Sequence, residues 1–168
     1  MTVSSADHAA RREDLRRRYI QPRADRPASM ARGIHHLALI CRDVEQTIEF
    51  YQGLLGFPLI ELVENRDYAG SNHLFFDLGH GNLLAFFDFP GLDLQPGVES
   101  FGSVQHLAIS IEPAQFEAAK ARLAAAGIPY LGPDRGITNS IYFRDPDGVQ
   151  MELLREPLLE MDERALGD

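Results

Sequence analysis

An internal duplication constrains this fold more than any other feature of the chain. Three pairs of similar segments show it: IHHLAL at 34–39 and VQHLAI at 104–109, GFPL at 56–59 and GIPY at 127–130, SNHLFF at 71–76 and TNSIYF at 138–143. A duplicated sequence predicts two similar modules whose equivalent strands can face one another. His36 and His106 occupy the same position in their repeats.

Each repeat has the pattern of one strand, one helix and three more strands. The first copy predicts strands at 34–41, 59–63, 73–77 and 83–89, with a helix at 44–55. The second copy predicts strands at 104–111, 129–131, 139–144 and 149–154, with a helix at 113–126. Gly56 and Gly127 follow the two helices as stop signals. The pattern predicts an α+β fold of two tandem βαβββ modules, which form a curled mixed sheet around a cleft.

The ends of the chain differ from these modules. Residues 1–32 carry eight arginines against four acidic residues, so this basic N-terminal extension has a charge of +4. We expect a short helix at 9–20 within it. The two-module domain is predicted at 33–155, with module one at 33–95 and module two at 103–155. An acidic C-terminal tail follows at 156–168.

Charge and composition exclude several function classes. The chain has a net charge of −9, which leaves −13 outside the extension and argues against a nucleic-acid partner. Its apolar runs fall short of the roughly 20 residues that span a bilayer, so we expect no membrane partner. The lone cysteine, Cys41, fits a reducing compartment, and we expect a cytoplasmic location.

Three residues in the repeats are candidate metal ligands. Because side chains alternate between the two faces of a strand, His36 and His106 project among small or apolar neighbours, and Glu152 does so on the last strand. An ionised glutamate there is costly unless a cation neutralises it. Two histidines and one carboxylate are the ligands of a facial site with open positions, typical of non-haem iron. Each residue alone is also explained by an ordinary core or surface role.

The stretches GIHHLALICRDVEQTIEFYQGLLGFPL, VQHLAISI and IYFRDPDGVQMELL resemble the vicinal oxygen chelate superfamily over about residues 33–155. That superfamily includes glyoxalase I, methylmalonyl-CoA epimerase, extradiol dioxygenases, fosfomycin-modifying transferases and bleomycin-binding proteins. The resemblance implies that His36, His106 and Glu152 bind a divalent metal in the cleft. The superfamily's fourth ligand position is Ala85 here, which argues against both isomerases, because they carry glutamate or glutamine there.

Three ligands with an apolar fourth position resemble the extradiol ring-cleaving dioxygenases. In that class a tyrosine ten residues before the glutamate contacts the catecholate, which implies a substrate-orienting role for Tyr142. The acid/base histidine of the class aligns with Asn82, so His80 or His73 must substitute, or Tyr142 itself. The resemblance implies a metal-dependent dioxygenase of a catecholic small molecule, with Fe(II) favoured and Mn(II) possible. Four further residues are candidate contacts to the substrate: Phe75, Asn82, Phe87 and Ser140.

Two other functions remain open. A Mn-dependent thiol transferase of the fosfomycin type uses the same three ligands, although it needs cations for a phosphonate and this chain has only Lys120 as lysine. A non-catalytic small-molecule binding protein of the bleomycin-resistance type is the other alternative. Because two-module members of the superfamily often dimerise, some by exchanging modules, the resemblance also implies a homodimer.

Overall fold

The computed structural model describes residues 5–134 and 139–155, which fall into two units, 1–32 and 33–168. The first unit contains α1 (Ser5–Tyr19), none of whose residues is buried. Asp14 forms exposed ion pairs with Arg11, Arg17 and Arg18 of the same helix. Among the described residues, none of the helices has the length and apolar character needed to cross a membrane.

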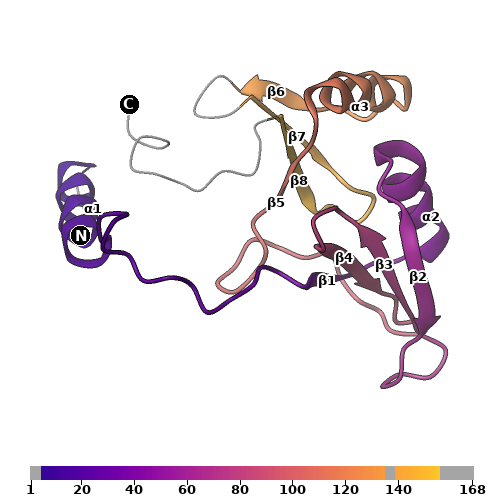
Figure 1. The fold of residues 1–168 in the computed structure, drawn as a ribbon. Helices are drawn as coiled ribbons and strands as arrows, with labels where there is room; N and C mark the ends of the chain where they lie inside the picture. Colours follow the sequence, from indigo (N-terminus) through magenta and orange to yellow (C-terminus); the bar gives the residue numbers. More distant parts are fainter. Residues whose placement is uncertain (1–4, 135–138, 156–168) are drawn as a thin grey trace. The chain divides into compact units, whose positions relative to one another are not determined.

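Module one begins the second unit (Figure 1). Its elements are β1 (His36–Ile40), α2 (Val44–Ile48), the π-helix η1 (Glu49–Leu55), β2 (Leu59–Glu64), β3 (Asn72–Asp77) and β4 (Leu83–Phe87). The Asp43 side chain caps α2 by accepting the N–H of Gln46 at 2.9 Å. The helical segment ends at Gly56, whose φ of 81° suits a residue without Cβ.

Module two repeats this order. Its elements are β5 (Leu107–Ser110), α3 (Pro113–Ala125), β6 (Leu131–Asp134), β7 (Ser140–Arg144) and β8 (Gln150–Leu154). The sheets have the matching orders β1-β4-β3-β2 and β5-β8-β7-β6, each with a parallel pair between its first two strands. The prediction of two βαβββ modules with mixed sheets is therefore confirmed. One strand differs in position, since β6 starts at Leu131 instead of 129.

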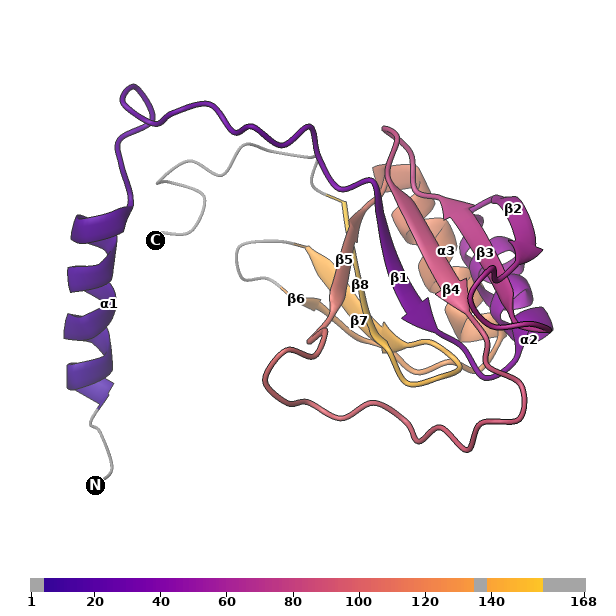
Figure 2. The same ribbon diagram turned by 90° about the horizontal axis from the view of Figure 1, so that it is seen from below.

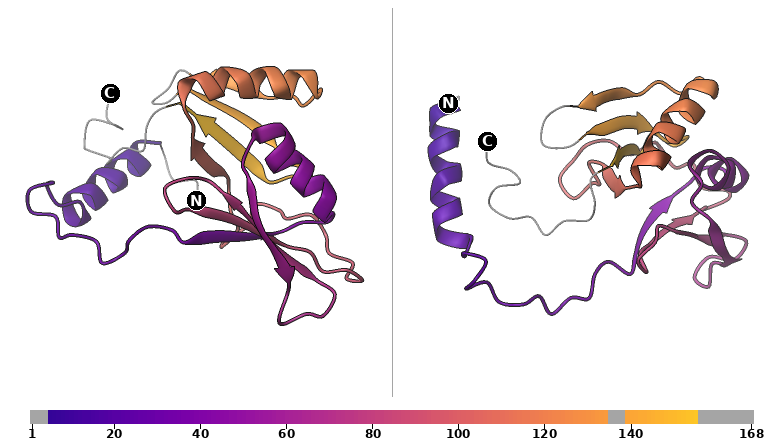
Figure 3. Two further views of the ribbon diagram at one scale, coloured as in Figure 1. Left: turned by 45° about the vertical axis from the view of Figure 1, so that its right-hand side comes forward. Right: turned by 45° about the horizontal axis from the view of Figure 1, so that its top comes forward.

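One hydrophobic core joins the two modules. It combines side chains of both helical segments with the inner faces of both sheets, including Tyr51, Phe116, Phe143 and Met151. The helical segments lie side by side in every view (Figures 2 and 3). Arg122 of α3 donates from Nε to the Leu54 carbonyl at 2.5 Å, which satisfies an acceptor at the end of η1.

The helices cover the inner faces of the sheets, and the candidate site residues lie on the opposite, outer faces. On β1, Leu37 and Leu39 pack against the core, while His36, Ala38 and Ile40 are exposed. The same alternation on β7 buries Ile141 and Phe143 in the core. The predicted site residues His36, His106, Tyr142 and Glu152 all belong to outer faces. Within one chain the two sheets remain separate.

Candidate metal centre

The outer face of module two brings His106, Tyr142 and Glu152 together; we call them the module-two half-site. Glu152 of β8 pairs with Ala108 of β5 on one side and with Tyr142 of β7 on the other. Its Oε2 lies 3.0 Å from Nε2 of His106, and the Tyr142 hydroxyl donates to its Oε1 at 2.9 Å. Only 7% of Glu152 is exposed. A nearly buried carboxylate is thus held by two defined neighbours.

The donor atoms of this half-site fit a divalent cation. Nδ1 of His106 contacts the side-chain oxygen of Gln105, which accepts the imidazole proton on that nitrogen. With the proton there, Nε2 turns its lone pair toward a carboxylate oxygen, an arrangement that needs a proton or a metal ion between the two acceptors. Metal bonds to such donors measure about 2.0–2.2 Å, so donors 3.0 Å apart can bind one ion side by side.

The outer face of module one presents His36, His73 and Phe75, the module-one half-site. Nδ1 of His36 lies 2.8 Å from Nδ1 of His35, which leaves its Nε2 as the nitrogen for a metal. Its ring is 5.8 Å from the Phe75 ring and 6.5 Å from the His73 ring, measured between centroids. The first candidate metal ligand of the chain therefore adjoins an aromatic surface.

His73 is held between aromatic rings. It stacks on Phe87 at 3.8 Å with an interplanar angle of 19° and lies 4.1 Å from Phe75. Desolvation, and secondarily the neighbouring His36, lowers the pKa of His73 below its usual value. Its Nε2 is buried and has no hydrogen-bond partner among the described residues. A buried polar atom without a partner is a candidate contact for a bound molecule.

The aromatic surface continues away from His36. Phe87 stacks on Phe89 at 6.1 Å, and Tyr68 meets Phe89 edge-on at 5.4 Å. We call Phe75, His73, Phe87, Phe89 and Tyr68 the aromatic row. It follows the outer face of β3 and β4 beyond the end of the sheet. Ala85 lies on the same face, fully buried and without a donor atom, as the sequence predicted.

His80 and Asn82 lie apart from this row, in the turn between β3 and β4. His80 is exposed with a φ of 53°, and the Asn82 amide donates to the Gly79 carbonyl at 3.2 Å. The turn leads into Leu83, which pairs with His36. Both residues thus belong to a turn near this candidate metal ligand, and His73 is the better positioned acid/base candidate.

The two half-sites stay separate within one chain. Across residues 5–134 and 139–155, no group of three or more histidine, cysteine or acidic side chains is close enough to hold a metal ion. His36 belongs to the first sheet, and His106 and Glu152 belong to the second. The predicted set of three ligands on one ion therefore remains a prediction.

Sequence reasoning missed three features of these half-sites, and each had a signal. Gln105 precedes His106 directly, so its amide is within reach of the imidazole along the chain. Phe89 lies two residues after Phe87, so it faces the same side of the chain beyond the end of β4. Tyr142 and Glu152 are symmetric about the Asp145–Gly148 turn, so hairpin register places them opposite each other.

Residues 33–153 match the Glyoxalase/Bleomycin resistance protein/Dioxygenase superfamily. The chain belongs to this superfamily. The match covers both modules and both half-sites, which agrees with the duplicated fold. The relatives of the chain include a putative ring-cleaving dioxygenase, a metallothiol transferase and a glyoxylase, so one scaffold carries proteins of several named functions.

The similar proteins differ in their named functions. The chain is 26% identical over 144 residues to the putative ring-cleaving dioxygenase MhqO of Bacillus subtilis, covering 84% of this chain but only 46% of MhqO. It is 33% identical over 139 residues to the metallothiol transferase FosB of Shouchella clausii, covering 78% of this chain and 85% of FosB. A solved structure of the fosfomycin resistance protein FosX from Listeria monocytogenes, complexed with Mn(II) and sulfate, matches with a TM-score of 0.56 and 24% identity over 77% of this chain and 96% of that one. The chain thus spans about half of MhqO and most of FosB.

Proposed function

We propose that this protein is a metal-dependent enzyme that cleaves the ring of a catecholic or similar aromatic small molecule. The observation that carries the proposal is the aromatic row, which starts beside His36 and offers half-buried aromatic side chains to a planar substrate. Aromatic pairs contribute about 0.5–1.5 kcal/mol beyond simple burial. A small aliphatic phosphonate gains little from such a surface.

We propose that His36, His106 and Glu152 hold the metal, Fe(II) in preference to Mn(II), and that two copies of the chain supply them. Among the described strands, β1 and β5 each lie at the edge of a sheet and pair on one side only. Apolar side chains beside these edges are exposed, including Ile34, Ile40 and Val104. Pairing module one of one copy with module two of another covers these residues and unites the half-sites in a homodimer.

In the assembled site the protein side chains orient the substrate and handle its proton. The aromatic row stacks on the ring and excludes water from it. Tyr142, fixed by its bond to Glu152, contacts a substrate oxygen. Nε2 of His73, neutral because its pKa is lowered, accepts the phenolic proton. When bound, the ion supplies Lewis-acid chemistry and, as Fe(II), redox chemistry.

A second candidate is a Mn(II)-dependent thiol transferase that acts on a phosphonate antibiotic. The length and identity of the FosB match favour it. The outer face of β7 also carries Tyr142 and Arg144, which offer hydroxyl and guanidinium donors for an anion. Ser140 of the same strand is fully buried, so its hydroxyl is not accessible to a ligand. This face lies next to Glu152 through the pairing of β7 with β8.

Metal loading followed by two activity assays distinguishes these functions. Protein loaded anaerobically with Fe(II) should consume oxygen with a panel of catechols and hydroquinones. Protein loaded with Mn(II) should not add a thiol to fosfomycin. Thiol addition without oxygen uptake would reverse the ranking, and ligand binding with neither reaction would favour a binding protein. His106→Ala should lose metal and activity, whereas His8→Ala, an exposed histidine of α1, should retain both.

A further inference from the structure

The two modules differ at the outer edge of their sheets. In module one, β2 pairs with β3 at five positions from Leu59 to Glu64. In module two, the described pairing of β6 with β7 is confined to Leu131 and Asp134, with a register shift between them. The segment 128–130, which precedes β6, therefore leaves the adjoining part of β7 uncovered. This difference opens the edge of module two.

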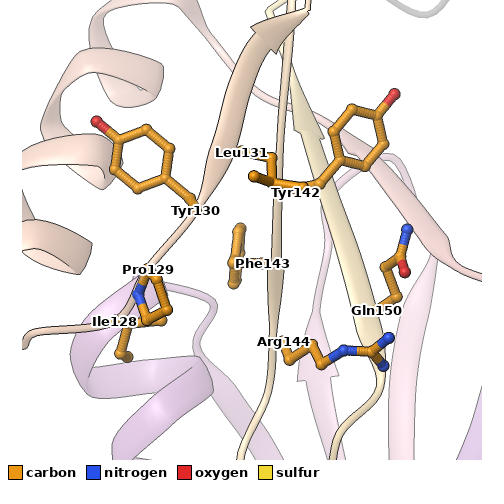
Figure 4. A pocket seen from close by; sticks show the side chains of 8 residues that line it. All are labelled: Ile128, Pro129, Tyr130, Leu131, Tyr142, Phe143, Arg144 and Gln150. Atoms are coloured by element: carbon orange, nitrogen blue, oxygen red, sulfur yellow. The ribbon is translucent and has the colours of Figure 1, made fainter.

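A cavity of about 410 Å³ occupies this edge. Figure 4 shows Ile128, Pro129 and Tyr130 on one side, Tyr142 on the other, and Phe143 between them. The volume lies within the range of small-molecule sites, which combine apolar walls with a few polar groups. The rings of Tyr130 and Tyr142 make the cavity suitable for an aromatic ring, while Phe143, only 4% exposed, closes its base.

The polar end of the cavity carries the positive charge of an arginine side chain. Arg144 and Gln150 are paired across β7 and β8 and lie on the same side as Tyr142 in Figure 4. Nη1 of Arg144 donates to the Gly148 carbonyl at 2.6 Å, which fixes the guanidinium while other N–H donors remain available. Within the described residues no carboxylate pairs with Arg144, although the chain has an excess of acidic residues.

We propose that this cavity binds an aromatic carboxylate. The ring lies against Phe143 between Tyr130 and Tyr142, and the carboxylate binds the guanidinium of Arg144 with help from the Gln150 amide. A planar guanidinium matches a carboxylate with two parallel hydrogen bonds. The site needs no metal and is separate from the three metal-ligand positions. It borders the module-two half-site through Tyr142, so the ligand reaches the neighbour of Glu152.

The test is calorimetric titration of the full chain after metal removal with a chelator. The probes are 3-phenylpropionate, its uncharged analogue 3-phenylpropanol, and 3-cyclohexylpropionate, which keeps the charge but lacks the aromatic ring. We expect 3-phenylpropionate to bind at least tenfold more tightly than either analogue. Arg144→Gln should weaken its binding tenfold or more, whereas Arg66→Gln, an exposed arginine of module one, should have no effect.

Two further variants keep the inference falsifiable if Arg144→Gln disturbs the turn at Gly148. Gln150→Leu should weaken the binding of 3-phenylpropionate several-fold. Tyr130→Leu should weaken the binding of 3-phenylpropionate more than the binding of 3-cyclohexylpropionate. Absence of binding at millimolar concentration would overturn the inference. So would equal affinity for 3-phenylpropanol, or an affinity unchanged in all of the cavity variants. The result is independent of oxygen uptake, so it is distinguishable from failure of the proposed ring cleavage.

Discussion

Replacing Tyr142 by phenylalanine removes one defined hydrogen bond from the candidate metal centre. The Tyr142 hydroxyl donates to Oε1 of Glu152 at 2.9 Å, while Oε2 of the same carboxylate faces Nε2 of His106. Hydrogen bonds to charged groups are worth about 1.5–3 kcal/mol. Because Glu152 is 7% exposed, water replaces the lost donor poorly. The carboxylate therefore becomes freer to rotate away from the metal position.

The expected result is a dissociation constant for Mn(II) or Fe(II) that rises about 10–100-fold, as for loss of other groups that orient metal ligands. This equals about 1.4–2.7 kcal/mol of binding free energy. Anaerobic titration of chelator-treated protein against a competing metal indicator measures it. Tyr130→Phe is the matched control, because it removes a hydroxyl from the same module without touching Glu152. An unchanged dissociation constant in Tyr142→Phe would refute the reasoning that this hydroxyl orients a metal ligand.

Two further predictions concern the core and the aromatic row. Tyr51→Phe should lower the free energy of unfolding by about 1–3 kcal/mol in urea titrations, because it removes the 2.9 Å hydrogen bond from a fully buried hydroxyl to Asp145. Burial already raises the pKa of the Asp145 carboxyl. Unchanged stability would contradict this prediction. His73 should titrate by NMR below the ordinary histidine pKa and move back toward it in Phe87→Ala, since stacking on Phe87 contributes to its desolvation. Because its folded pKa is depressed, the contribution of His73 to stability is present above pH 6.5 and is lost as the pH falls through the folded pKa; a pKa at or above 6.5 would contradict the burial argument.

The fold could be predicted from the sequence because the internal duplication and the strand periodicity are visible in short segments of the chain. The capping of α2 by Asp43 and the stop at Gly56 are local hydrogen-bond and backbone preferences, and both are found in the structure. The start of β6 was misplaced because strand limits at an edge depend on pairing with a neighbour. β6 meets β7 at few described positions, so its sequence alone gives little indication of where pairing begins.

Only part of the candidate site could be predicted from the sequence. The alternation of side chains along each strand placed His36, His106 and Glu152 on outer faces, because this alternation follows from strand geometry. Whether the sheets of one chain face each other depends on packing between modules, which no short motif encodes. Instead, the Tyr51–Asp145 bond joins η1 to the turn between β7 and β8, and the Arg122 contacts join α3 to η1. Among the described residues, His36, His106 and Glu152 form no common cluster, and the second copy that would unite them stays a proposal.

Complementation between two inactive variants tests the central claim, that two copies jointly hold one ion, most directly. His36→Ala and His106→Ala should each bind little metal as pure proteins. If the site joins His36 of one copy to His106 of another, a refolded equimolar mixture contains heterodimers with one intact site each, and should recover about a quarter of the wild-type metal content. A mixture with no more metal than the separate variants would contradict a shared site.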